Sequence, residues 1–209
     1  MNTIAYFISD LTALIPVAAG LYFFKRLKAD RRFFVYFLIY AAIVELTNAL
    51  MAWYDLSNLW SINIYTCVEY FFYAFILNKW VKGIFMRWMT IIGSVVFLTF
   101  WIGHFFIHET LNTTNIAADV TESAVLTLLA CFVVTTLSLK TEHPVLKNYR
   151  FWFSAVLFIY FSVSVLLSLV MTRLMENPNA YEFDAWIIHT IINISMNVVF
   201  AHVFSLKER

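Results

Sequence analysis

Seven long apolar stretches follow one another along the chain, and they restrict the fold more than any other feature of the sequence. Each has about the 20 residues that a helix needs to cross the hydrocarbon core of a bilayer. The stretches are too long for strands, and they lack the alternation of polar and apolar residues that a half-buried strand shows. We therefore predict an all-α membrane protein of seven transmembrane helices, over residues 4–24, 33–53, 60–81, 88–108, 119–140, 151–173 and 185–206.

The composition indicates a chain dissolved in lipid rather than in water. Of the 209 residues, 62% are hydrophobic and 13% are charged, and the mean hydropathy is +0.78. A soluble domain usually carries about 25% charged residues, so this chain has too few polar side chains to cover its apolar ones in water. Only four Gly and three Pro are present, which leaves no linker, and we predict a single transmembrane domain over residues 1–209.

The basic residues predict how the chain crosses the membrane. All but one of the fourteen Lys and Arg residues, Arg173, fall in or beside the first, third and fifth connections or at the C-terminus. Cytoplasmic connections carry an excess of Lys and Arg. We therefore predict an outside N-terminus, a cytoplasmic C-terminus and a multi-pass protein of the inner (plasma) membrane. The net charge of +1 and the lack of a long basic run exclude nucleic acid as a partner and leave the lipid bilayer as the expected one.

An internal repeat is compatible with this topology. The first three and last three helices have the same orientation, and Arg32 and Arg150 each precede an aromatic pair at the start of corresponding helices. A 3+1+3 plan of parallel repeats is one solution that transporters use. The alternative is that Arg recurs there because every helix has an interfacial end.

Polar side chains inside the predicted helices point to a pocket. An ionisable residue at the centre of a transmembrane helix costs about 2.5–3.5 kcal/mol, so it normally faces the bundle interior. By depth, these residues lie in the outer half of the membrane or near its middle, and the cytoplasmic half has almost none apart from His202. This distribution predicts a pocket open to the outside and closed by an apolar inner half. The predicted ligand-binding residues are Glu45, Glu69, His189, Asn193, Asp10 and Asn48.

The chemistry of this pocket leaves three ligand classes open. If Glu45 and Glu69 approach each other, they cannot both stay ionised in a low dielectric without a cation or a shared proton. His189 can change its charge near neutral pH. The pocket therefore suits a small cationic or amine ligand, a metal ion or a proton, and we predict neither a resident metal nor a cofactor. Asn48 and Asn197 alternatively serve only as interhelical hydrogen bonds. Asp10, Glu122 and His104 alternatively lie close enough to the outer surface to be in water.

Two known classes of seven-helix membrane protein require particular residues, which can be looked for in this sequence. A retinal protein needs a lysine in the middle of its last helix, and the only lysine near it, Lys207, lies past the end. Zinc-dependent membrane hydrolases of the ceramidase and adiponectin-receptor kinds carry H-x-x-x-H on the last helix. Here the same spacing runs from His189 to Asn193, with one histidine. Three good zinc ligands are hard to assemble from this set, so we lean against an enzyme.

Two segments carry a resemblance to a known group. With NIYTCVEY at residues 63–70 and IHTIIN at residues 188–193, the chain resembles uncharacterised bacterial seven-helix membrane proteins, which look like the membrane sensing modules of some histidine kinases. The resemblance implies a sensory or accessory role. Only a few residues follow the last predicted helix, so we expect a signal to pass to a separate signalling or effector protein. A small transporter, a membrane-embedded lipid hydrolase and a membrane accessory of a defence system remain alternatives.

Overall fold

The computed structural model describes residues 11–108, 110–140, 145–176 and 182–206, and these fold into seven α-helices without a strand. This confirms the predicted all-α chain, although residues 4–10 of the first predicted helix lie outside the described residues. The helices are α2 (Leu14–Phe23), α3 (Ala29–Trp53), α4 (Leu59–Trp80), α5 (Ile84–His108), α6 (Ile116–Lys140), α7 (Tyr149–Glu176) and α8 (Glu182–Ser205).

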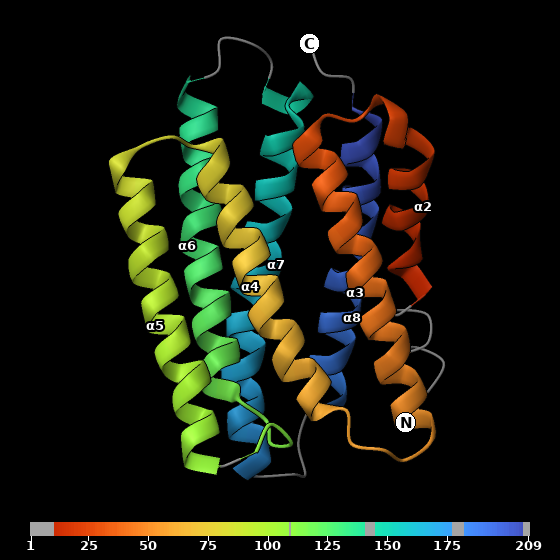
Figure 1. The fold of residues 1–209 in the computed structure, drawn as a ribbon, viewed down its shortest axis with the longest axis vertical. Helices are drawn as coiled ribbons and strands as arrows, with labels where there is room; N and C mark the ends of the chain where they lie inside the picture. The colour runs from red at the N-terminus through yellow and green to blue at the C-terminus, as the bar shows by residue number, and fades with distance from the viewer. Residues whose placement is uncertain (1–10, 109, 141–144, 177–181, 207–209) are drawn as a thin grey trace.

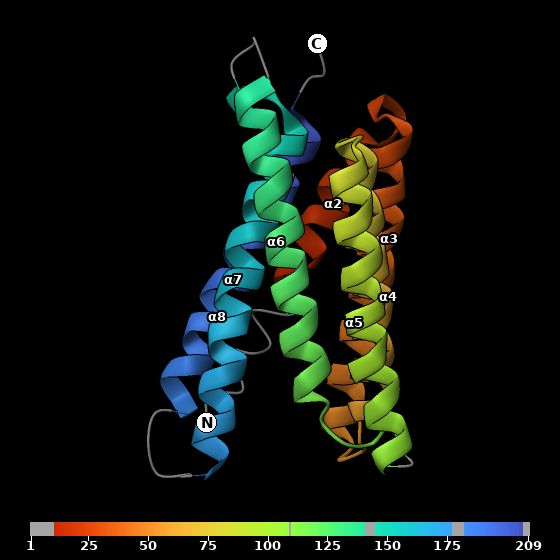
Figure 2. The same cartoon turned by 90° about the vertical axis from the view of Figure 1, so that its left-hand side faces the viewer.

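The helices form two layers. Figure 2 shows α3, α4 and α5 as one row and α6, α7 and α8 as the other, and α6 packs on both α4 and α5. Helix α2 packs against both α3 and α8 and so joins the rows at one edge. Short connections such as residues 54–58 make successive helices antiparallel neighbours.

The connections that carry basic residues lie at one end of the bundle. In Figure 1 the α2–α3 and α4–α5 connections lie at the upper end, and the α3–α4 and α5–α6 connections lie at the lower end. The upper end, which we call the basic end, is defined by residues 24–28, 81–83 and 145–148. Its Lys and Arg content follows the alternation that the sequence predicts, and the side of the membrane that it faces stays a prediction.

Helix α3 begins four residues earlier than the predicted residue 33, which is a correction to the predicted boundary. The Arg32 N–H donates to the Lys28 carbonyl at 2.9 Å, so residues read as a charged connection form the first helical turn. Asp30 lies in that turn, where the positive end of the helix dipole favours an acidic residue.

The outward faces of the helices are apolar. Large side chains such as Ile43, Phe106 and Leu128 are exposed, although soluble proteins rarely expose broad apolar patches. Four described helical segments are long and apolar enough to cross a membrane: Ala29–Trp53, Ile84–Ile107, Ile116–Leu139 and Tyr149–Leu169. Helix α4 is not one of these four, because Asn63 and Glu69 lower its hydropathy. The length and apolar character of these helices thus indicate a membrane protein.

Candidate functional site

A cavity of about 110 Å³ lies between α3, α4, α7 and α8, beside the start of α2. A water molecule in the liquid occupies about 30 Å³, so the space suits a small ligand or a few waters. Its floor and walls include apolar side chains such as Phe37, Leu38 and Met196. The polar side chains that line it are Glu45 of α3, Tyr65, Glu69 and Tyr73 of α4, Tyr160 of α7, and Asn193 and Asn197 of α8.

Helical spacing brings these polar groups onto inward faces. Tyr65, Glu69 and Tyr73 follow one another at intervals of four residues on α4, so they share one face of that helix. Asn193 and Asn197 are spaced in the same way on α8. Each of these two helices therefore presents a polar stripe to the cavity.

Hydrogen bonds hold Tyr65, Glu69 and Asn197 in the cavity wall. The Tyr65 hydroxyl donates to Glu69 Oε1 at 3.2 Å. The Asn197 amide donates to the Thr12 hydroxyl at 3.0 Å and ties α8 to the residues just before α2. The expected interhelical hydrogen bond of Asn197 is therefore present, and Asn197 also lines the cavity.

The structure brings three of the six predicted ligand-binding residues to one cavity. Glu45, Glu69 and Asn193 line it from three different helices. Asn48 lies one turn beyond Glu45 and does not line it; its backbone carbonyl accepts a hydrogen bond from the Asn58 amide at 3.4 Å.

The other two predicted residues fall where the structure gives no side chain. Asp10 lies outside the described residues, and His189 belongs to α8 but its side chain also lies outside them. Sequence reasoning missed Tyr160, because a tyrosine in an apolar helix normally indicates packing.

The cavity is electronegative. None of its described lining residues is Lys, Arg or His, whereas two carry carboxyl groups. A charge in a low-dielectric interior is costly unless an opposite charge or several hydrogen bonds compensate it. No cluster of three or more His, Cys, Asp or Glu with metal-site geometry occurs in the part of the chain that the structure describes. The polar part of the lining therefore consists of two carboxyl groups, three tyrosine hydroxyls and two asparagine side chains.

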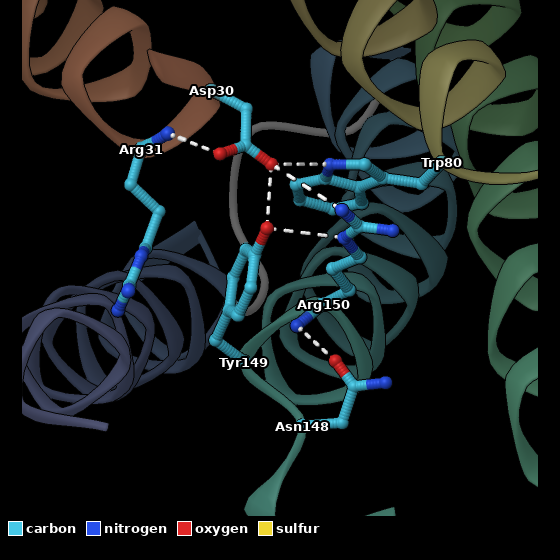
Figure 3. A network of polar contacts seen from close by, with 6 residues as sticks. All are labelled: Asp30, Arg31, Trp80, Asn148, Tyr149 and Arg150. Carbon is cyan, nitrogen blue, oxygen red and sulfur yellow. Dashed lines mark hydrogen bonds and ion pairs between the residues drawn. The ribbon is translucent and has the colours of Figure 1, made fainter. Parts of the chain in front are cut away.

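A second polar site lies at the basic end and was not predicted. Figure 3 shows the Asp30 carboxylate accepting hydrogen bonds from the Trp80 indole at 3.0 Å and from the Tyr149 hydroxyl at 2.5 Å. The Arg150 guanidinium donates to the Tyr149 oxygen at 3.0 Å and lies 3.9 Å from Asp30. Together with Arg31, these residues form what we call the Asp30 network.

Arg31 extends the Asp30 network to α8. Its guanidinium lies 4.6 Å from the Tyr149 ring centroid and donates to the Leu206 carbonyl at 2.9 Å and, more weakly, to the Val203 carbonyl at 3.4 Å. The network therefore joins α3, α4, α7 and the end of α8, which are the helices that wall the cavity.

The Asp30 network corrects the predicted apolar inner half of the bundle. Asp30 is 8% exposed and Arg31 4% exposed, so both are buried polar residues in the half where the sequence predicted almost none. Between them and the cavity, the Phe34 ring packs on Phe153 and Phe200, with centroids 4.5 and 4.8 Å away. An apolar layer thus exists, but a buried ion-pair network lies beneath it.

Fold and site together define a helical membrane protein with an electronegative internal cavity. No family model, curated protein or solved structure matches the chain. Its function is therefore argued from the chemistry of the cavity, and the resemblance to sensing modules stays a prediction.

Proposed function

We propose that the chain is a receptor-like or accessory membrane module that binds a small organic cation, of the ammonium class, in the cavity. The observation that carries this proposal is that Glu45 and Glu69, from two helices, line one cavity whose described lining residues include no cation. A bound ammonium group supplies the missing positive charge.

The tyrosines support an amine over other cations. Tyr65, Tyr73 and Tyr160 line the same cavity, and aromatic faces attract ammonium groups, most strongly where water is excluded. Tyrosine hydroxyls and asparagine carbonyls can also accept N–H hydrogen bonds. Hard metal ions prefer several oxygen ligands, often carboxylates, in a fixed shell, and the described residues hold no cluster of three or more His, Cys, Asp or Glu.

The direction of access follows from the proposed topology. The basic end faces the cytoplasm if Lys and Arg follow the rule for cytoplasmic connections. Glu45 lies in the half of α3 nearer the opposite end, so the ligand enters from outside. A separate signalling protein then reads the response at the short basic connections.

Binding measurements on the protein in nanodiscs test the proposal. Tetramethylammonium, ethylammonium and choline are the probes, and dimethylbutanol is an uncharged analogue of choline. At least one cation should bind and dimethylbutanol should not. The variant Glu69→Gln should weaken that cation about tenfold or more, which corresponds to about 1.4 kcal/mol.

The matched control is Asp55→Asn. Asp55 is exposed in the α3–α4 connection, and its φ of 53° is one that asparagine tolerates. Its substitution should leave the affinity unchanged. Equal affinity in Glu69→Gln and the control, or no binding of any cation, contradicts the proposal. Uptake of the bound cation into vesicles would instead support the transporter alternative.

A further inference from the structure

Helix α6 carries an acidic pair that does not line the cavity. Asp119 and Glu122 are three residues apart and so neighbour each other on the helix surface. Glu122 shares its face with the fully buried Ala118 and Leu126, and that face packs against α4. The sequence left open that Glu122 is simply in water, but it is only 5% exposed.

The carboxyl group of Glu122 lacks part of its hydrogen bonding. Its Oε1 atom is buried and has no hydrogen-bond partner among the described residues. Burying an ionised carboxylate without an opposite charge or hydrogen bonds costs roughly several kcal/mol. A neutral carboxyl group avoids most of that cost. A polar group in this state needs an explanation beyond packing.

The groups around Glu122 offer no positive charge in the described part of the chain. From α4 it faces Glu69, Cys67, Tyr70 and Tyr73, from α7 Tyr160, and from its own helix Asp119. On α5, the titratable side chain that the structure describes at this end is His104, whose Nε2 is engaged with the Thr113 hydroxyl at 2.9 Å. Three carboxyl groups therefore interact electrostatically across α4 and α6.

We propose that Glu122 and Glu69 share a proton inside the bundle and exchange it with water through Asp119. The proton sits on a carboxyl oxygen of one residue and balances the negative charge of its neighbours. On release it passes to water at the end opposite the basic end. Glu69 also lines the amine cavity, whereas Glu122 and Asp119 do not. The shared proton requires no bound amine.

The position of Asp119 supplies the exchange route. Asp119 is partly exposed in the first turn of α6, directly after the α5–α6 connection. Asn115 begins the same face, where its side chain accepts a hydrogen bond from the Ala118 N–H at 3.0 Å. The polar residues thus follow one face of α6 from the connection to Glu122, and the next residue on that face, Leu126, is apolar and fully buried.

Infrared spectroscopy of the protein in nanodiscs tests the shared proton without any added ligand. The carbonyl band of a protonated carboxylic acid, which ionised carboxylates lack, should be present at neutral pH. It should be lost or strongly reduced in Glu122→Gln and should return in Glu122→Asp, which restores a carboxyl group. Asp55→Asn is again the control, because Asp55 is exposed and should not contribute to the band.

Two results would overturn the shared proton. The first is a wild-type spectrum without the band at neutral pH, which requires no variant to fold. The second is a band that persists unchanged in a folded Glu122→Gln protein. In Asp119→Asn the band should remain while its exchange with deuterium oxide slows, and unchanged exchange would remove the proposed route.

Discussion

The Tyr149 hydroxyl is the central atom of the Asp30 network. It donates to the Asp30 carboxylate at 2.5 Å and accepts from the Arg150 guanidinium at 3.0 Å, so both of its partners are charged. Hydrogen bonds to charged groups contribute about 1.5–3 kcal/mol each. Removing this one atom leaves the ring in place and deprives both partners of a contact.

We expect Tyr149→Phe to lower the free energy of unfolding by about 1.5–3 kcal/mol. Denaturant titration in mixed micelles, followed by circular dichroism, measures the change. Tyr54→Phe removes a hydroxyl from a 70% exposed ring and should have little effect. Equal losses in the two variants would show that the hydrogen bonds to Tyr149 do not stabilise the fold.

For single residues, the sequence predicts a place in the cavity only where exposing a polar side chain to lipid would cost free energy. That cost identified Glu45, Glu69 and Asn193, because such side chains must turn inward. It did not identify Tyr160, because a tyrosine is tolerated in an apolar helix whether it packs or lines a site. Asp30 was missed for a further reason: its partners Trp80 and Tyr149 lie 50 and 119 residues away in sequence.

Among the helices, α5 approaches α6 closely at Gly93. A Cβ atom at this position would lie 2.5 Å from Cγ1 of Val125, which is a stiff β-branched side chain. Small residues allow such close approach between helices in membranes. Gly103 lies on the same helix, and a Cβ there would meet nothing within 4 Å.

We therefore expect opposite effects from two identical substitutions in α5. Gly93→Ala should destabilise the protein by about 1–3 kcal/mol, because the inserted methyl group forces the helices apart. Gly103→Ala should be neutral or stabilising by up to about 1 kcal/mol, because alanine favours the helix. The same denaturant titration compares them. A smaller loss at position 93 than at position 103 would contradict the packing.

Helix positions were predictable because the thickness of the bilayer fixes their length. The predicted ranges 60–81, 119–140 and 185–206 match α4, α6 and α8 to within a few residues. The starts of helices were harder to place, as α3 shows, because charged residues such as Asp30 and Arg31 look like a connection when their buried partners are unknown. The 3+1+3 repeat stays a prediction.

Over the whole molecule, the cavity and the Asp30 network are built on the same four helices. The cavity is lined by α3, α4, α7 and α8 near their middles, and the network joins those helices at the basic end. The rings of Phe34, Phe153 and Phe200 fill the space between the two sites. Packed side chains therefore connect the cavity to the basic end, and the proposed signal to a separate partner would pass through this connection.

The orientation of the bundle in the membrane can be tested, because its two ends differ in charge. We expect the basic end to be cytoplasmic, since Lys and Arg are retained on that side during insertion. Ser57 and Lys82 are exposed in short connections at opposite ends. In a background without Cys67 and Cys131, Ser57→Cys should react with a membrane-impermeant maleimide in intact spheroplasts, and Lys82→Cys only after permeabilisation. The reverse pattern would invert the topology and place the cavity's access on the cytoplasmic side, while labelling of both from outside would mean that no membrane separates them.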